Sequence, residues 1–250
     1  MVENGRRDCQ MKTRGPLPDL LAGLLPRGAR VLGALLPQDC VLCAAPSGDA
    51  YVCAPCAGEL PWLGEACPRC ALPSPGARVC GHCIAAPPAY DATVACFAYA
   101  FPIDRLVHAL KYGGRLALTR WFAACIATRA GAAARPDRVV AMPLHRLRLA
   151  ERGFNQSLEI ARHVARHAGV ELAAGAVARV RPTAPQVDLP LEARTRNVRD
   201  AFACAARLDG AHVAVVDDVM TSGATLDELA RTLKRAGAAR VTNWVAARTI

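Results

Sequence analysis

Runs of apolar residues alternate with amphipathic stretches of helical spacing over residues 91–250. Residues 213–216 (VAVV) are apolar and mostly β-branched, as expected of a strand buried on both faces of a parallel sheet. Residues 226–236 then place apolar side chains at helical spacing, and Gly237 follows as a helix-terminating residue. The pattern predicts a buried strand that leads directly into a helix with one buried face.

The same alternation extends over the rest of this part of the chain. We expect strands at residues 93–100, 138–142, 176–181 and 241–246, and helices at residues 103–111, 116–130 and 156–167. Strands that alternate with helices favour parallel pairing with right-handed crossovers. The predicted fold class is therefore α/β, with a mostly parallel sheet flanked by helices.

The cysteines between residues 40 and 83 form four C-x-x-C pairs, and each cysteine of the first two pairs recurs 27 residues later. Two such pairs supply the four thiolates of a structural zinc site. We expect one zinc site in each repeat, formed by Cys40, Cys43, Cys53 and Cys56 and by Cys67, Cys70, Cys80 and Cys83. An interleaved pairing remains open. Disulfides are the competing interpretation, which the lack of a recognisable secretory signal disfavours.

These patterns predict three parts of the chain. Residues 1–36 form an N-terminal segment with a Pro-interrupted amphipathic helix, residues 37–87 a small double zinc ribbon, and residues 88–250 the α/β domain. The apolar N-terminal stretch contains Pro26 and arginines, so we expect no membrane span, with membrane contact as a minor alternative. The expected location is the cytoplasm.

The chain carries a net charge of +10. Residues 91–250 account for +9 of it, with 23 basic and 14 acidic side chains. Such an excess favours partners that carry phosphate, which include a diphosphorylated sugar, a nucleotide and nucleic acid.

Two adjacent acids, Asp217 and Asp218, follow the buried strand at 213–216. Ligands bind beyond the carboxyl ends of strands in open α/β sheets, and helix N-termini attract phosphate. The following turn supplies small and hydroxyl residues for a phosphate cradle: Thr221, Ser222, Gly223, Ala224 and Thr225. The simpler alternative is a helix cap by Ser222 or Thr225, with Thr225 and Glu228 as a capping box.

A second group of polar residues follows the strand at 138–142. The segment 143–156 (PLHRLRLAERGFNQ) contains Arg146, Arg152, Asn155 and Gln156. If this strand neighbours the one at 213–216, these side chains face the same crevice, where cations would stabilise a diphosphate leaving group. The alternative is a solvated basic face.

Residues 213–225 (VAVVDDVMTSGAT) resemble the phosphoribosyl pyrophosphate (PRPP) signature of type I phosphoribosyltransferases, and the whole chain resembles the ComF/GntX family of competence-related proteins. The sequence RGFNQ at 152–156 is among the specific features of that family. The resemblance implies that Asp217 and Asp218 hold ribose hydroxyls, that the following loop holds the 5′-phosphate, and that Mg²⁺ accompanies PRPP. Lys111, in a matching K-Y-G segment, joins Arg146 and Arg152 at the diphosphate end.

The resemblance also implies a flexible hood over the sugar and base, which contains Arg194 and Asn197. It agrees with an N-terminal double zinc ribbon that holds two structural Zn²⁺ ions. The leading hypothesis is a phosphoribosyltransferase-like protein that binds PRPP or a related phosphoribosyl ligand and has a connection with DNA uptake. Single-stranded DNA and DNA-uptake or helicase proteins are the implied partners. The alternative is a non-catalytic factor that handles nucleic acid or acts as a scaffold through its basic surface and zinc ribbons.

Overall fold

The computed structural model describes residues 38–48, 50–131, 135–182 and 197–250. The chain forms two compact units, residues 1–59 and residues 60–250. The predicted N-terminal helix lies outside the described residues. In the first unit the structure describes β1 (Gln38–Asp39), β2 (Pro46–Gly48) and α2 (Ala54–Gly58).

The second unit contains the predicted parallel sheet. Its order is β3-β9-β8-β4-β5, and all four neighbouring pairs are parallel. The strands are β3 (Ala92–Ala98), β4 (Arg138–Ala141), β5 (Glu171–Leu172), β8 (His212–Met220) and β9 (Arg240–Arg248). β4 pairs directly with β8, which was the condition for a shared crevice at their carboxyl ends. The predicted α/β fold class is confirmed.

Helices and a short hairpin complete this unit. The helices are α3 (Gly81–Ala85), α4 (Ile103–Tyr112), α5 (Leu118–Ala130), α6 (Arg146–Arg152), α7 (Gln156–Ala168), α9 (Ala224–Arg235) and the 3-10 turn η1 (Pro75–Ala77). β6 (Val177–Arg179) pairs antiparallel with β7 (Phe202–Cys204), on either side of residues 183–196, which lie outside the described part. The sequence predicted α4, α5, α7 and α9 to within a few residues but missed α6, β5 and β7.

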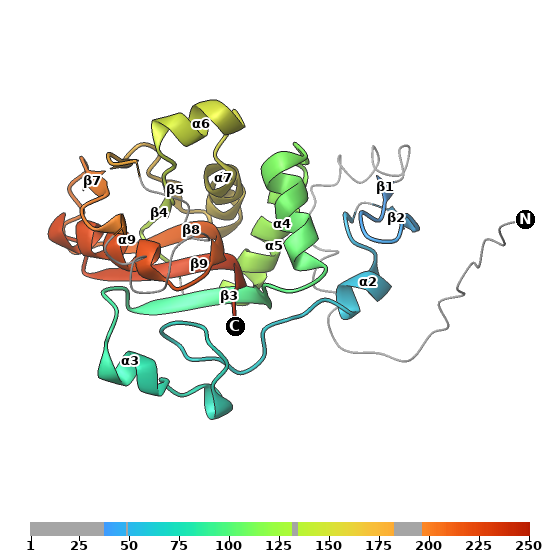
Figure 1. Cartoon of the computed structure of the whole chain (residues 1–250), viewed down its shortest axis with the longest axis horizontal. Coiled ribbons are helices and arrows are strands. Elements are labelled where there is room, and N and C mark those ends of the chain that lie inside the picture. Colours follow the sequence, from blue (N-terminus) through green and yellow to red (C-terminus); the bar gives the residue numbers. More distant parts are fainter. Residues whose placement is uncertain (1–37, 49, 132–134, 183–196) are drawn as a thin grey trace, which may run out of the picture. The chain divides into compact units, whose positions relative to one another are not determined.

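The two faces of the sheet have different covers. Figure 1 shows α4, α5 and α7 on one side and the segment that contains α3 on the other. Alternate residues of the central strands, such as Val215 and Val245, belong to a core cluster with Leu229 and Leu233 of α9. Cys67, Cys70 and Cys83 of the second cysteine repeat belong to the same cluster.

The second repeat is therefore built into the core of the α/β unit. The Pro68 carbonyl accepts a hydrogen bond of 2.9 Å from the Thr93 amide of β3, and the Trp62 ring lies 4.4 Å from that of Phe97. The separate domain at residues 37–87 stays a prediction. The two compact units meet between residues 59 and 60, inside that range.

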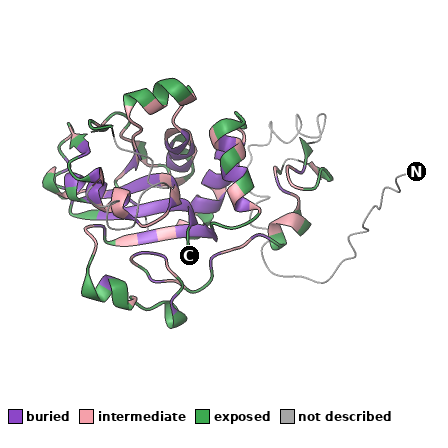
Figure 2. Ribbon diagram, viewed as in Figure 1, coloured by how far each residue is buried: buried purple, intermediate pink, exposed green. Residues whose placement is uncertain are grey.

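Burial follows the element pattern closely. In Figure 2 the central strands are purple over most of their length, and α4 shows one buried and one exposed face. β8 has an unbroken buried run from Val213 to Val216, as its apolar sequence predicted. None of the helices in the described residues is long and apolar enough to cross a membrane.

Candidate functional site

The acid pair lies near the carboxyl end of β8. This strand extends to Met220 and so is longer than predicted. Asp217 accepts a hydrogen bond of 2.8 Å from the hydroxyl of Ser157, and Asp218 accepts one of 3.0 Å from the amide of Gln156. Both donors lie at the start of α7. β4 pairs with β8, and the chain runs from β4 through α6 to α7, which brings the N-terminus of α7 to the acids.

Lys111 reaches the same place from the end of α4. Its ammonium lies 2.9 Å from the Asp218 carboxylate, and the two side chains are 22% and 6% exposed. Arg152 donates to the side-chain oxygen of Gln156 at 2.7 Å. The Arg152 guanidinium also lies 5.3 Å from the centre of the Tyr112 ring. Of the predicted site residues, Lys111 and Gln156 thus contact Asp218, and Arg152 contacts Gln156.

The electrostatics of the acid pair favour uptake of a cation. Burial and the neighbouring Asp218 charge raise the pKa of Asp217 to about 7, and the Ser157 hydroxyl opposes this only in part. Burial acts to lower the pKa of Lys111, but the Asp218 carboxylate outweighs it and raises that pKa. Burial therefore favours the protonated form of Asp217, and a cation bound beside it would favour the ionised form.

In the phosphate cradle, Gly223 directly precedes α9 and has a φ of 85°. A Cβ atom at this position would lie 2.7 Å from the Met220 methyl and 3.1 Å from the Tyr90 hydroxyl. Only glycine fits both the left-handed backbone and the close approach. In the described part of the chain, the amides of Ser222 and Gly223 have no protein acceptor, so they are available to an anion at the helix N-terminus.

The structure does not contain the alternative capping box of Thr225 and Glu228. Gly223 occupies the N-cap position of α9, with no side-chain cap, and Thr225 lies inside the helix. The Glu228 carboxylate instead accepts from the Asp200 amide at 3.1 Å and lies 3.6 Å from Arg235. The Ser222 hydroxyl accepts a hydrogen bond of 3.4 Å from the Ala224 amide.

Other predicted site residues lie elsewhere or have structural contacts. The Asn155 side chain caps α7 by accepting from the Ser157 and Leu158 amides, and it donates to the Met142 carbonyl at 3.0 Å. Arg146 is exposed and lines a cavity of about 230 Å³ together with Asn155 and Arg179. Asn197 is half-buried and is the first residue of the described range 197–250. Arg194 lies outside the described residues.

Sequence reasoning missed two residues of this site. Ser157 directly follows the RGFNQ segment, and its position at the start of a helix was the available signal. Arg248 ends β9, is 4% exposed, and donates to carbonyls of the cradle loop. A charged residue at the end of an otherwise apolar strand was the signal for Arg248.

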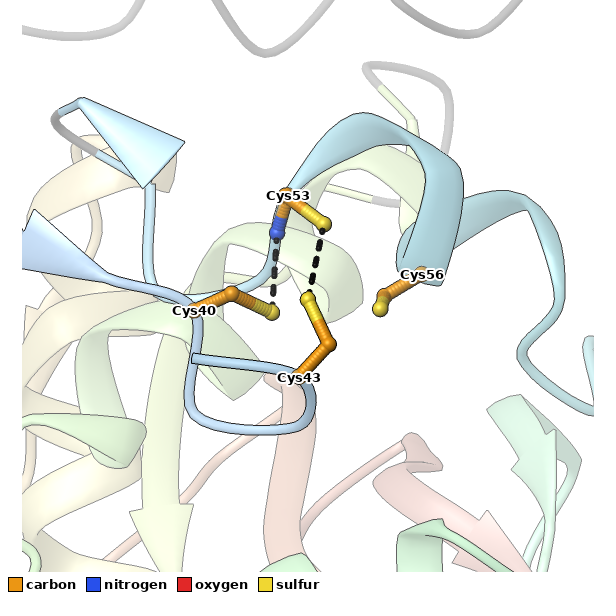
Figure 3. A group of neighbouring side chains, drawn as sticks. All are labelled: Cys40, Cys43, Cys53 and Cys56. Carbon is orange, nitrogen blue, oxygen red and sulfur yellow. Dashed lines mark hydrogen bonds between the residues drawn. The ribbon is translucent and has the colours of Figure 1, made fainter. Parts of the chain in front are cut away.

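The cysteines form two tetrads, grouped within each repeat as predicted. In each tetrad all four sulfur atoms lie within 4.8 Å of one another. Figure 3 shows the first tetrad, in which the sulfurs of Cys43 and Cys53 are 3.7 Å apart. Cys70 and Cys80 of the second tetrad are separated by 3.5 Å. A tetrahedral zinc site with Zn–S bonds of about 2.3 Å has sulfur–sulfur edges of about 3.8 Å, so both tetrads fit zinc.

The repeats also match in the contacts of their thiols. The Cys53 amide donates to the sulfur of Cys40 at 3.4 Å, and the Cys80 amide donates to the sulfur of Cys67 at 3.3 Å. Burial opposes ionisation of Cys40 and Cys67, but such amide donors outweigh it and lower the pKa of each thiol to about 6. In each repeat, the amide donors to one thiol thus favour its thiolate form, which is the form that binds metal.

Comparison with known proteins agrees with this organisation. A family model described as a double zinc ribbon domain matches residues 31–84, and one described as a phosphoribosyl transferase domain matches residues 155–248. The "DNA utilization protein YhgH" of Escherichia coli K12 is 37% identical over 170 residues, which cover 66% of this chain and 75% of that protein. The "Competence protein F" of Haemophilus influenzae is 28% identical over 170 residues, 64% of this chain and 74% of that protein.

Among solved structures, a purine phosphoribosyltransferase from Pyrococcus horikoshii is similar over 60% of this chain and 74% of its own. The identity is 15% and the TM-score is 0.32.

Proposed function

The chain belongs to the ComF family, with a double zinc ribbon followed by a phosphoribosyltransferase domain, and on that premise we propose that it binds PRPP or a related phosphoribosyl ligand together with Mg²⁺. One observation carries the proposal. The adjacent acids at the end of β8 meet Lys111 and Gln156 beside a turn that only glycine can form. This combination suits a ligand with hydroxyls, a phosphomonoester and a diphosphate.

In the proposed complex the acids hold the ribose hydroxyls. Asp217 and Asp218 are hydrogen-bond acceptors, and their negative charge stabilises the positive charge that develops on the sugar as diphosphate departs. Mg²⁺ suits this place because carboxylate and diphosphate oxygens are its preferred ligands. The tetrads need reduced thiols, which fits the cytoplasmic location expected from the sequence.

The phosphates lie at opposite ends of the proposed ligand. The amides of Ser222 and Gly223 and the nearby hydroxyls bind the 5′-phosphate, in the manner of an anion at a helix N-terminus. Lys111 and Arg152 bind the diphosphate, and Lys111 exchanges its bond to Asp218 for one to the ligand. Arg146, Arg194 and Asn197 stay candidates for contacts with the diphosphate or the base.

The experiment mixes the purified protein with PRPP, Mg²⁺ and a panel of nucleobases. The expected results are a rise in thermal stability with PRPP and release of diphosphate with the accepting base. The double variant Asp217→Asn/Asp218→Asn should show neither. Failure of PRPP to stabilise the wild-type protein would remove the binding proposal, and binding without release would limit the function to binding.

A second candidate function is the handling of single-stranded nucleic acid, in keeping with the names of the relatives. The supporting observation is the exposure of two aromatic side chains, one of which lies beside an arginine. Phe101 and Tyr112 are 76% and 66% exposed, and Arg152 lies over the Tyr112 ring. Exposed rings stack on bases, and cations beside them bind the backbone.

This candidate predicts salt-dependent binding of a single-stranded oligonucleotide. Tyr112→Ala and Phe101→Ala should each weaken it about fivefold or more, since stacking contributes about 1–3 kcal/mol per base. Equal binding by the wild-type protein and the Phe101→Ala/Tyr112→Ala variant would count against this surface.

A further inference from the structure

Arg248 is a buried arginine whose partners are main-chain carbonyls. It is the last residue of β9, pairs in register with Met220 of β8, and is 4% exposed. Within the described ranges its guanidinium forms no ion pair with a carboxylate. Burying a guanidinium is costly unless its donors are satisfied, so the carbonyls around it hold a fixed arrangement.

The guanidinium connects the cradle to the second cysteine tetrad. Its Nη1 atom donates to the carbonyls of Met220 at 3.2 Å, of Thr249 at 2.6 Å, and of Thr221. Its Nε atom donates to the carbonyl of Cys70 at 2.8 Å. One planar group therefore joins the first residues of the cradle loop to a cysteine whose sulfur belongs to the second tetrad.

The bond to Thr221 orients a peptide group of the loop, and the bond to Met220 acts on the preceding peptide group together with one of 3.0 Å from the Thr249 amide. In a trans peptide the C=O and the following N–H point in opposite directions. Because the Met220 and Thr221 carbonyls face Arg248, the Thr221 and Ser222 amides are turned away from it. This is the orientation that an anion on the other side of the loop requires.

Tyr90 provides a second link between the core around the second tetrad and the cradle. Tyr90 is 4% exposed and belongs to the core cluster that includes Cys70, Cys83 and Met220. Its hydroxyl would lie 3.1 Å from a Cβ atom at Gly223. Arg248, through its bond to Cys70, and Tyr90, through the core cluster, thus both connect this part of the core with the loop.

We propose that Arg248 is a positioning residue for the phosphate cradle and that it makes the orientation of the cradle amides depend on the second cysteine tetrad. This inference rests on the proposed function and assigns a regulatory element to the same site. Loss of metal from the second tetrad frees the Cys70 main chain, releases one of the bonds that hold the guanidinium, and loosens the loop. The first tetrad belongs to the other compact unit.

The test measures two ligands that occupy different ends of the site, ribose 5-phosphate and magnesium diphosphate. Arg248→Lys keeps the charge but cannot donate to the same set of carbonyls. We expect its affinity for ribose 5-phosphate to fall about tenfold or more, while that for magnesium diphosphate is unchanged. Arg240→Lys, at the exposed start of the same strand, is the control and should change neither. Equal loss of both ligands, or loss of neither, would overturn the proposal.

Hydrogen exchange provides a readout that needs no ligand. Peptides that cover residues 217–225 should exchange faster in Arg248→Lys and in Cys80→Ser than in the wild-type protein. Cys53→Ser, the equivalent substitution in the first repeat, should leave them unchanged. If the wild-type protein binds neither ligand, the proposed function fails. Hydrogen exchange then still tests whether Arg248 positions the loop. Unaltered exchange of this segment in Arg248→Lys would refute its positioning role.

Discussion

The ammonium of Lys111 lies 2.9 Å from the carboxylate of Asp218, although 107 residues separate the two in the chain. Lys111 comes from the end of α4 and Asp218 from the end of β8, and the packing of that helix beside the sheet brings them together. In the free protein the lysine neutralises one of the two acids. A ligand that carries its own cation would replace Lys111 at Asp218 and leave it to bind phosphate.

Replacement of this lysine should affect both stability and binding. Lys111→Gln leaves the buried Asp218 carboxylate without its cation, so we expect a loss of about 1–3 kcal/mol in the free energy of unfolding. The affinity for PRPP with Mg²⁺ should also fall about tenfold or more, because a charged contact to diphosphate is lost. Chemical denaturation and calorimetric titration measure the two effects.

The matched control is Lys234→Gln. Lys234 lies 3.0 Å from Asp91, but the two side chains are 34% and 39% exposed. Such a surface pair contributes about 0–1 kcal/mol, so the control should change stability little and affinity not at all. A similar loss in both variants would mean that burial of the Lys111–Asp218 pair has no special effect.

The close approach at Gly223 predicts a specific sensitivity of the cradle. Gly223→Ala combines an unfavourable φ with a Cβ atom 2.7 Å from the Met220 methyl. We expect a destabilisation of about 2 kcal/mol or more and loss of ribose 5-phosphate binding. Gly210→Ala isolates the backbone effect, because its φ is 73° and no atom lies within 4 Å of the added Cβ. Ligand binding by the Gly210→Ala variant should remain normal, and binding by Gly223→Ala would exclude the proposed cradle.

The raised pKa of Asp217 predicts a pH dependence of stability. This carboxyl titrates at about 7 in the folded protein, above the value of about 3.9 for an unfolded aspartate. Folding therefore favours its protonated form, so its stabilising contribution is complete below about pH 4 and declines until about pH 7. Asp217→Asn carries a neutral side chain and lacks this decline.

Denaturation of both proteins across this pH range tests the prediction. The stability of Asp217→Asn relative to the wild-type protein should rise between about pH 4 and pH 7 and then level off. A difference that stays constant with pH would show that Asp217 titrates at an ordinary value in the folded protein.

The different surroundings of the tetrads predict unequal effects of equivalent cysteine substitutions. Cys83 is 2% exposed in the core of residues 60–250, while its counterpart Cys56 belongs to the other compact unit. Because a structural metal contributes its binding energy to folding, Cys83→Ser should lower the Tm of the α/β unit by more than about 4 °C. Cys56→Ser should leave that transition in place. Metal analysis should find two zinc ions in the wild-type protein and about one in each variant.

The sequence by itself determined the features that depend on local pattern. Apolar runs and helical spacing predicted the main strands and helices of the α/β unit, because backbone periodicity decides which side chains share a face. The spacing of the C-x-x-C pairs predicted how the thiols group, since each repeat is short enough to close its own tetrad. The acid pair and the glycine turn were predicted for the same reason, as neighbours in the chain.

Only the tertiary structure decided which distant residues meet. Arg248 and Cys70 are 178 residues apart in the chain, and Ser157 and Asp217 are 60 apart. No local pattern encodes such pairs, because they depend on the strand order and on what covers each face of the sheet. The same packing placed the second cysteine repeat in the core of residues 60–250. The chemistry of the site was therefore visible in the sequence, while the residues that support it followed from the packing of the sheet.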